Sequence, residues 1–422
     1  MTQATHPDDL LIIGGGIGGL TLALMLERAG LRPFVFEAAA EIKPIGVGIN
    51  LLPHAMKELS ALGLEAEIAR RGIATREAAF FNRFGQLIYR EPLGRAAGYD
   101  WPQISIHRGD LHLVLLKACR NALGPERVLT GWQCVKVEQD EAGAIAHFVE
   151  TASGKSLPSQ RGRAAVGCDG IHSVLRKQFF PDEGEPHYTG INMWRGVTRW
   201  PPILSGATMT RAGWFNAAKL VIYPIRDGID AEGRQLTNWL VEVATDKYKP
   251  RRDWNRPGRL EDFIGIVEDW HFDWLDAPAF FRAADVILEY PMVDQEPLPR
   301  WSFGRATLLG DAAHPMVPRG SNGAGQAILD CRALAECLTT HKDDAVAALR
   351  DYEARRRIAA ANVVLTNRKN PPDAILREVY ERTGDKPFAR IEDVISAAEL
   401  QALSDRYKRV AGYDKAALAA KG

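Results

Sequence analysis

Three glycines near the N-terminus stand where an apolar strand passes into a helix. Gly14, Gly16 and Gly19 follow the apolar run 10–13 and precede a helical run that ends at Gly30. In a G-x-G-x-x-G turn the first glycine allows the tight bend, the second lets a pyrophosphate approach the backbone, and the third lets helix and strand pack closely. The pattern predicts a dinucleotide-binding βαβ unit, and a glycine turn with only a packing role is the alternative.

Two carboxylates stand where such a unit would use them. Glu37 closes the strand expected at residues 33–37, where a carboxylate accepts hydrogen bonds from the adenosine ribose. Asp311 ends the apolar strand expected within 305–311, at the carboxyl edge of the sheet, where ligands of doubly wound folds bind. Its carboxylate suits a hydroxyl of the bound cofactor, and the alternative role is a helix N-cap.

Two further motifs resemble those of a known family. Residues 167–173 (GCDGIHS) with Arg176 resemble the Asp-Gly motif of the group A flavoprotein monooxygenases, the para-hydroxybenzoate and salicylate hydroxylase relatives. Residues 310–315 (GDAAHP) with Pro318 resemble the second flavin motif of that family, and the resemblance extends over about residues 8–368. It implies non-covalent FAD, NADH or NADPH as co-substrate, and O2, with oxygen transferred from a C4a-hydroperoxyflavin to a small aromatic compound.

Within that family, five stretches are most similar to the 5-methylphenazine-1-carboxylate monooxygenases. They are residues 46–50, 105–109, 193–197, 290–294 and 322–324. The sequence departs from the wider family after Pro318, where residues 320–324 read GSNGA in place of G-Q-G-x-N, and at Ile358, where proline is common. The first departure falls on the expected flavin turn, whereas the second concerns helix geometry.

The resemblance assigns roles to individual residues. Arg108 is expected to reach the flavin or its pyrophosphate, with a surface salt bridge as the alternative, and Asp169 is expected either to serve cofactor binding or to act as a cap. The helix that begins near Gly323 would direct its positive end at the flavin N1 and C2 carbonyl, and His314 is interpreted as positional rather than as a proton relay. The expected cofactor set is Gly14, Gly16, Ile17, Gly18, Gly19, Glu37, Val47, Gly48, Arg108, Asp169, Asp311, Asn322, Gly323 and Ala324.

The hydrophobic pattern predicts an α/β fold with an inserted antiparallel sheet. A helix is expected over 53–62, a hairpin over 77–90, and strands punctuated by proline and tryptophan from about 183 to 298. The expected division is a Rossmann-like FAD-binding domain in three parts (1–76, 101–182 and 299–368), a substrate domain in two parts (77–100 and 183–298), and a C-terminal helical segment (369–422).

Substrate contacts are expected from the inserted sheet, although no catalytic base is identified. The candidates are Arg195, Trp214, Tyr223 and Trp239, and for each a core or surface position is the alternative. Strand alternation places Met193 and Arg195 on one face and Trp194 on the other. Aromatic walls and an arginine suit an aromatic or N-heteroaromatic acid.

Composition excludes other classes of protein. The 422 residues carry 53 basic and 53 acidic side chains, so no overall field favours nucleic acid or an anionic membrane. The five cysteines lack the spacing of a zinc site, and their odd number argues against a disulfide framework, so we expect a cytoplasmic protein without a metal site. We also expect a monomer or a homodimer. A flavin-dependent reductase or dehydrogenase and a non-catalytic FAD or NAD sensor stay open as alternatives.

Overall fold

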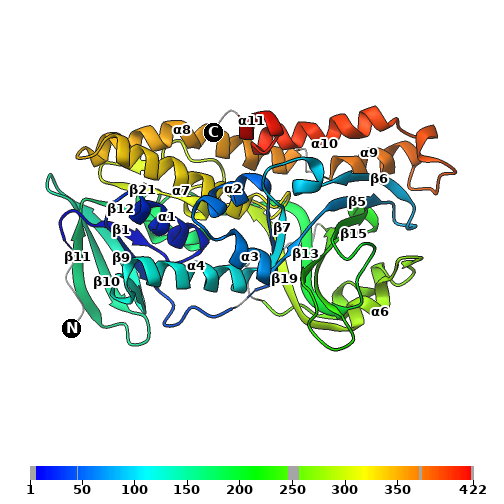
Figure 1. Cartoon of the computed structure of the whole chain (residues 1–422), viewed down its shortest axis with the longest axis horizontal. Coiled ribbons are helices and arrows are strands. Elements are labelled where there is room, and N and C mark those ends of the chain that lie inside the picture. The colour runs from blue at the N-terminus through cyan, green and yellow to red at the C-terminus, as the bar shows by residue number, and fades with distance from the viewer. Residues whose placement is uncertain (1–5, 45, 246–255, 370–372, 420–422) are drawn as a thin grey trace.

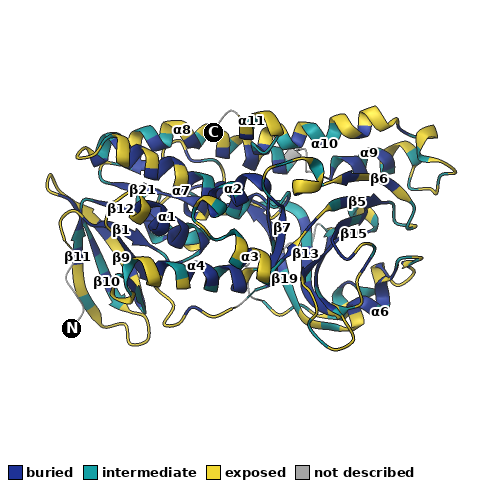
Figure 2. Ribbon diagram, viewed as in Figure 1, coloured by how far each residue is buried: buried dark blue, intermediate teal, exposed yellow. Residues whose placement is uncertain are grey.

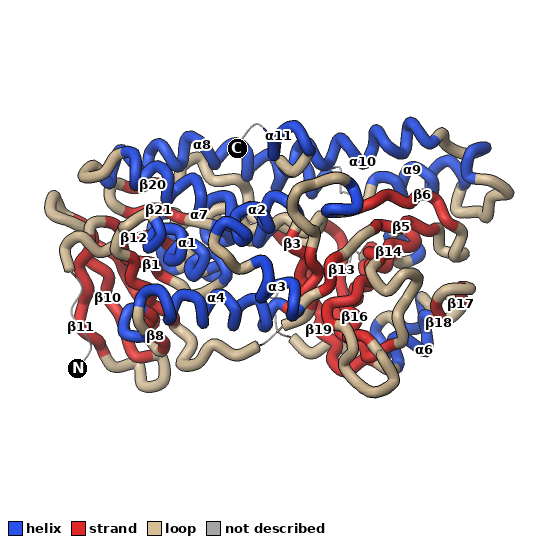
Figure 3. Tube along the Cα trace, viewed as in Figure 1, coloured by secondary structure: helices blue, strands red, loops and turns tan. Residues whose placement is uncertain are grey.

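The computed structural model describes residues 6–44, 46–245, 256–369 and 373–419. The molecule is elongated, with a parallel sheet at one end, an antiparallel sheet at the other, and long helices along one side of both (Figure 1). The strands form two separate groups below these helices (Figure 3). The arrangement confirms the expected fold class, whereas the domain boundaries stay a prediction.

The parallel sheet has the strand order β20-β21-β12-β1-β2-β8. Its central strands β12, β1 and β2 are apolar and almost entirely buried, as in sheets covered by helices on both faces. Ile13 at the end of β1 lies beside Gly167 at the end of β12, so the glycine turn and the Asp-Gly motif meet at one edge. The strands are β1 (Leu10–Ile13), β2 (Pro33–Glu37), β8 (Val128–Thr130), β12 (Ala164–Gly167), β20 (Ser302–Phe303) and β21 (Ala306–Leu308).

Helices and two small sheets complete this end of the molecule. The strand β7, which ends just before Arg108, belongs to a small sheet with the order β3-β7-β4 and not to the parallel sheet. The helices are α1 (Ile17–Arg28), α2 (Pro53–Ala61), α3 (Glu65–Arg71), α4 (Arg108–Leu123), α5 (Val174–Phe179), α7 (Gly323–Thr340) and α8 (Ala345–Lys369). The small-sheet strands are β3 (Gly48–Leu51), β4 (Ile73–Ala74), β7 (Ile104–His107), β9 (Trp132–Gln139), β10 (Ala144–Glu150) and β11 (Ser156–Gly162).

The inserted sheet has seven strands in the order β19-β13-β16-β15-β14-β5-β6. All neighbours are antiparallel except β14 and β5, and the hairpin β5–β6 joins the sheet from far upstream in the sequence. Met193 and Trp194 lie in different hydrophobic clusters, so the expected alternation along β13 is confirmed. The strands are β5 (Glu77–Phe81), β6 (Leu87–Pro92), β13 (His187–Trp200), β14 (Thr208–Gly213), β15 (Lys219–Arg226), β16 (Gln235–Ala244) and β19 (Ala284–Asp294), with β17 (His271–Phe272), β18 (Leu275–Asp276) and α6 (Ala277–Arg282) packed nearby.

The C-terminal helices lie along the hairpin β5–β6 and α8. They are α9 (Ala374–Thr383), α10 (Ala397–Ala411) and α11 (Lys415–Ala419). Their apolar sides face the sheets and their outer sides are exposed (Figure 2). A capping box between Ser396 and Glu399 begins α10. The segment is therefore an integral part of the fold.

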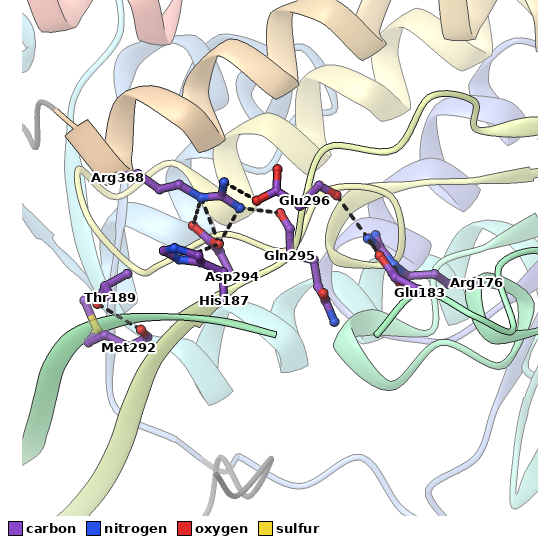
Figure 4. Close-up of polar contacts among 9 residues, drawn as sticks. All are labelled: Arg176, Glu183, His187, Thr189, Met292, Asp294, Gln295, Glu296 and Arg368. Carbon is purple, nitrogen blue, oxygen red and sulfur yellow. Dashed lines mark hydrogen bonds and ion pairs between the residues drawn. The ribbon is translucent and has the colours of Figure 1, made fainter. Parts of the chain in front are cut away.

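Two chain connections cross between the ends of the molecule, and an arginine holds each of them. Arg176 of α5 pairs with Glu183 on the outgoing connection, and Arg368 of α8 lies between Asp294 and Glu296 on the returning one (Figure 4). Asp294 is fully buried and receives two nitrogens of Arg368 at 2.7 and 2.8 Å. These bidentate contacts fix the places at which the two sheets are joined.

None of the helices in the described part of the chain combines the length and apolar character needed to span a membrane. Within the same residues, no group of three or more histidine, cysteine, aspartate and glutamate side chains is placed to hold a metal ion.

Candidate active site

In the glycine turn, Gly14 and Gly19 are too closely packed to admit a side chain, whereas the space beside Gly16 is free of protein atoms. A Cβ at Gly14 would lie 2.4 Å from the carbonyl oxygen of Cys168, and one at Gly19 would lie 2.0 Å from that of Gly14. A Cβ at Gly16 would have no atom within 4 Å. Gly14 also has a φ of 107°, which favours glycine. The turn thus offers open backbone at its second glycine, which fits the approach of a pyrophosphate.

Glu37 and His112 hold the turn from either side. The Glu37 carboxylate accepts the backbone NH of Gly15 at 2.7 Å and that of Ala39 at 2.7 Å. His112 Nε2 lies 2.6 Å from the Gly15 carbonyl oxygen and must donate to it. Burial lowers the pKa of His112, which favours the neutral ring. His112 was not predicted, although its place one turn after Arg108 on a helix was a usable signal.

Asp311 faces solvent at the carboxyl edge of the parallel sheet, within η7 (Gly310–Ala312). Among the described residues its carboxylate has no hydrogen-bond partner, and it caps neither η7 nor α7. The side chain is exposed by surface area, yet it is crowded by protein atoms; this desolvation raises its pKa, while the charges of His314 and Arg108 oppose the rise. An unengaged carboxylate beside the glycine turn fits a ligand hydroxyl, and the N-cap alternative is wrong.

Asp169 acts as a cap and keeps one oxygen free. Its Oδ2 accepts the backbone NH of Val174 at 2.7 Å at the start of α5. Its Oδ1 is buried and has no partner in the described structure. Burial raises the pKa of Asp169, and its hydrogen bonds only partly offset this. Both expected roles are therefore compatible with the geometry.

Arg108 begins α4 and lies against the 46–48 segment. A Cβ at Gly46 would be 3.6 Å from Arg108 Cδ. The guanidinium has no hydrogen-bond or ion-pair partner among the described residues, so the salt-bridge alternative is not observed. His107 caps α4 by accepting the NH of Gly109 at 3.2 Å. The free cation beside the glycine turn suits a phosphate.

The second flavin motif is held by a buried carboxylate. Asp330 of α7 lies 2.6 Å from His314 Nε2, receives Arg356 Nε at 2.7 Å, and accepts the NH of Gly310 at 3.2 Å. Burial would raise the pKa of Asp330, but His314 and Arg356 hold it below the usual value. His314 therefore fixes the turn, in agreement with its positional interpretation.

The Asp-Gly motif touches this turn directly. Arg176 Nη1 donates to the carbonyl oxygens of Ala312 and Ala313 at 3.0 Å each. The NH of Leu309 donates to Gly167 at 2.9 Å. The two motifs, far apart in sequence, therefore form one structure around the carboxyl edge of the sheet.

The start of α7 matches the expected flavin turn. The helix begins at Gly323 and carries no acidic residue in its first turn, so its NH groups present a positive end. Asn322 before it is fully buried, and its Oδ1 has no partner in the described structure. A buried acceptor without a donor is costly, which fits a site built for a ligand.

Two substrate candidates instead clamp the segment at Gly48. Arg195 donates from Nη2 to the Gly48 carbonyl at 2.9 Å, and Tyr223 donates its hydroxyl to the same oxygen at 3.1 Å. The Gly48 NH donates to Asn238 Oδ1 at 2.7 Å. Arg195 also lies 5.3 Å from the ring centre of Tyr290. These side chains join the inserted sheet to the flavin-side segment 47–48.

The two tryptophan candidates do not line the same space. Trp239 is fully buried in the sheet core, where its indole donates to Thr198 at 2.9 Å, so its substrate role is wrong. Trp214 lines a separate groove between the hairpin turn and α9. Both positions follow from the packing of the inserted sheet against elements that the sequence could not place.

A larger cavity opens beside the turn at residues 319–323, which precedes α7 and is called the flavin turn below. It lies between strands β5, β6 and β14, residues 320 and 321, and the C-terminal helices, and about 500 Å³ of space there, including open solvent, is free of protein atoms. Phe80, Met209 and Arg211 line it from the sheet, and Tyr407 and Tyr413 line it from the C-terminal segment. Arg211 and Tyr407 were not predicted, because their contacts join parts of the chain that are distant in sequence.

The fold and the site together define an FAD-binding oxidoreductase. A family profile described as "FAD binding domain" matches residues 8–198 and 291–367, and the chain belongs to this family. The phenazine 1,6-dicarboxylic acid hydroxylase PhzS of Lysobacter antibioticus is 42% identical over 97% of this chain and 98% of that protein. The 3-hydroxybenzoate 6-hydroxylase of Polaromonas naphthalenivorans is 32% identical over 87% of this chain and 88% of that protein.

Solved structures show the same fold. Klebsiella pneumoniae HpxO, complexed with FAD and uric acid, superimposes with a TM-score of 0.71 at 23% identity, covering 96% of this chain and 92% of that chain. CtdE in complex with FAD and substrate superimposes with a TM-score of 0.74 at 18% identity, covering 96% and 98%. The chain is an FAD-dependent aromatic monooxygenase with NADH or NADPH as co-substrate.

We expect Asp311→Ala to weaken FAD binding, because losing an acceptor for a ribityl hydroxyl costs about 1–3 kcal/mol, or about 5- to 150-fold in Kd. Titration of the apoprotein with FAD measures the change. Asp343→Ala, which alters an exposed aspartate far from the turn, is the control. Equal FAD affinity of the two variants would contradict the role of Asp311.

We expect Asp330→Asn to lower the free energy of unfolding at pH 7 by about 3 kcal/mol, because it breaks a buried charge network. The lowered pKa of Asp330 means that its contribution is present above the ordinary aspartate pKa and is lost as the pH falls through the folded value. Denaturant unfolding from pH 7 to pH 3 should therefore show the two proteins converging in acid. Asp351→Asn, at a surface pair with Arg355, should cost less than about 1 kcal/mol. A loss at Asp330 no larger than this control would contradict the expectation.

Proposed function

We propose that this monooxygenase hydroxylates a planar N-heteroaromatic carboxylic acid of the phenazine type, and that the cavity beside residues 320 and 321 is its substrate pocket. The wall carries Phe80, Tyr407 and Tyr413, which suit a flat ligand. The two relatives named above are, by their names, hydroxylases of aromatic acids. An electrophilic oxygen transfer also requires an electron-rich ring, so an amine or hydroxyl substituent is part of the proposal.

The proposal that the substrate bears a carboxylate rests on a buried cluster of charged side chains beside the pocket. Among the described residues, this cluster holds more cations than carboxylates. Arg211 pairs with Asp373 at 2.8 Å, and Lys219 pairs with Asp373 at 2.5 Å and with Glu242 at 2.8 Å. Arg319 lies 3.4 Å from Glu242. All five side chains are at most 12% exposed. Within the part of the chain that the structure describes, three cations of this cluster face two carboxylates, and an uncompensated buried charge is costly.

The surplus positive charge reaches the pocket through Arg211. Burial would raise the pKa of Asp373, but Lys219 and Arg211 hold it below the usual value, so this carboxylate is ionised and engaged by the cations of the cluster. Glu91, a carboxylate in the pocket wall, pairs with Lys408 at 2.8 Å. A substrate carboxylate would supply the missing anion. Arg195, bound to the Gly48 carbonyl, is the weaker candidate for this contact.

The cofactor residues form a second part of the proposal. The glycine turn with Arg108 would hold the pyrophosphate, Glu37 the ribose, Asp311 a ribityl hydroxyl, and the start of α7 the pyrimidine edge of the flavin. Bound FAD would supply reduction by NAD(P)H and activation of O2. The five cysteines are free thiols, which suits the expected cytoplasmic location. A monomer or homodimer is proposed on the sequence alone.

The function is tested with the purified holoenzyme, NADH or NADPH, and a panel of phenazine carboxylic acids and hydroxybenzoates. We expect slow NAD(P)H oxidation without substrate, because the only glycine fingerprint in the sequence is assigned to FAD and the nicotinamide must visit transiently. The right acid should accelerate it and yield a product that gains one oxygen by mass. Oxidation that no compound stimulates, without an oxygenated product, would favour the reductase alternative.

We expect Arg211→Gln to raise KM for the acid about 10- to 100-fold, since a hydrogen bond between charged groups contributes about 1.5–3 kcal/mol. The KM of a matched neutral analogue, such as the amide, should change little. Arg199→Gln, at an exposed ion pair on β13, is the control, and Arg195→Gln should impair acid and amide equally because it loosens Gly48. Equal losses on acid and amide for Arg211→Gln would remove the carboxylate from the proposal.

A further inference from the structure

The C-terminal segment reaches the flavin turn through Tyr407 of α10. The hydroxyl of Tyr407 donates to Asn367 Oδ1 at 3.0 Å and accepts the side-chain amide of Asn322 at 2.5 Å. All three side chains are buried. Tyr407 lies outside the matched family regions, which end at residue 367. The contact therefore joins the matched FAD-binding regions to a part of the chain that lies outside them.

Tyr407 also sets the shape of the turn. A Cβ at Gly320 would lie 1.8 Å from the Tyr407 hydroxyl oxygen, so the phenol occupies the space that any other side chain would need. Gly320 has a φ of 65° and Ser321 has a φ of 58°, which is uncommon for serine. Asn50 holds the other side of the turn by donating to Ser321 Oγ at 3.3 Å. Such a backbone persists only where its surroundings fix it.

Residues that contact or neighbour Tyr407 hold both ends of the turn 319–323 by hydrogen bonds. Asn367 donates from Nδ2 to the carbonyl oxygen of Arg319 at 3.4 Å, and Arg319 Nη1 donates back to the carbonyl oxygen of Asn367 at 3.4 Å. At the other end, Gln326 of α7 donates to the carbonyl oxygen of Ala411 at 3.1 Å. Burial raises the pKa of Tyr407, so the phenol is neutral and can both donate and accept.

Tyr407 holds the amide nitrogen of Asn322, so the remaining amide oxygen lies in a buried position where none of the described residues donates to it. Asn322 immediately precedes the first residue of α7, whose NH groups form the positive end expected to face the flavin. The orientation of this amide is thus decided by a residue about 85 positions later in the chain. A flavin with an NH at its pyrimidine edge is a ligand that could satisfy the free oxygen.

We propose that Tyr407 is a positioning residue of the reaction, which orients Asn322 and the turn 319–323 against the flavin at the wall of the substrate pocket. The inference rests on the proposed role of this turn in flavin binding. It gives the C-terminal segment a function: it completes the flavin site from outside the FAD-binding domain.

The test compares Tyr407→Phe with Tyr89→Phe, both as full-length holoenzymes. Tyr89 donates a hydrogen bond from β6 to Gln401 of the same helix, away from the flavin turn, so both variants lose one hydroxyl at α10. We expect Tyr407→Phe to raise the FAD Kd roughly tenfold, in line with the loss of a buried hydrogen bond, and to shift the flavin absorption band and reduction potential. Tyr89→Phe should retain wild-type values, with both proteins shown to be folded by circular dichroism.

A double-mutant cycle with Asn322→Ala separates positioning from general loosening. If Tyr407 acts through Asn322, the double variant should bind FAD no more weakly than the weaker single variant. Multiplied effects on Kd, or a Tyr407→Phe enzyme with the FAD Kd and flavin spectrum of Tyr89→Phe, would overturn the inference. If Asn322→Ala itself leaves the FAD Kd unchanged, the proposed flavin role of the turn fails, and the positioning role fails with it.

Discussion

The flavin side of the molecule depends on one buried carboxylate. Asp330 has no exposed surface, and it binds His314, Arg356 and the backbone of Gly310 at once. These contacts fold the motif after β21 back onto α7, so Asp311 is left pointing into solvent beside the glycine turn. Because a buried charge is tolerated only with its partners in place, the helices α7 and α8 and the turn must assemble together.

The junction between the two sheets is built from polar contacts to backbone rather than from apolar packing alone. Gly48 receives side chains of three strands of the inserted sheet, and a Cβ there would lie 2.6 Å from Asn238. Arg176 and Arg368 fix the two connections on the other side of the junction. Such directional contacts define the relative position of flavin turn and sheet, which a hydrophobic interface of the same size would define less well.

Features that lie within one short stretch of sequence could be predicted, whereas contacts between distant parts of the chain could not. The glycine turn, Glu37 and Asp311 could be found because each lies in a contiguous motif whose strand and helix are readable from hydrophobic periodicity. Trp239 was misassigned because composition cannot tell a pocket wall from a sheet core. Arg211 and Tyr407 carry no motif, and their importance arises from partners such as Asp373 and Asn322 that only the folded chain brings near.

Several residues of the proposed substrate pocket lie outside the regions that match the FAD-binding family. The residues proposed to hold the cofactor lie in the matched regions, whereas Arg211 lies in the unmatched part of the sheet and pairs with Asp373, after the last matched residue. Changes confined to the inserted sheet can therefore alter the proposed pocket without changing the glycine turn. Since Asp373 and Tyr407 both come from the C-terminal segment, the pocket and the flavin turn are completed only when that segment has packed.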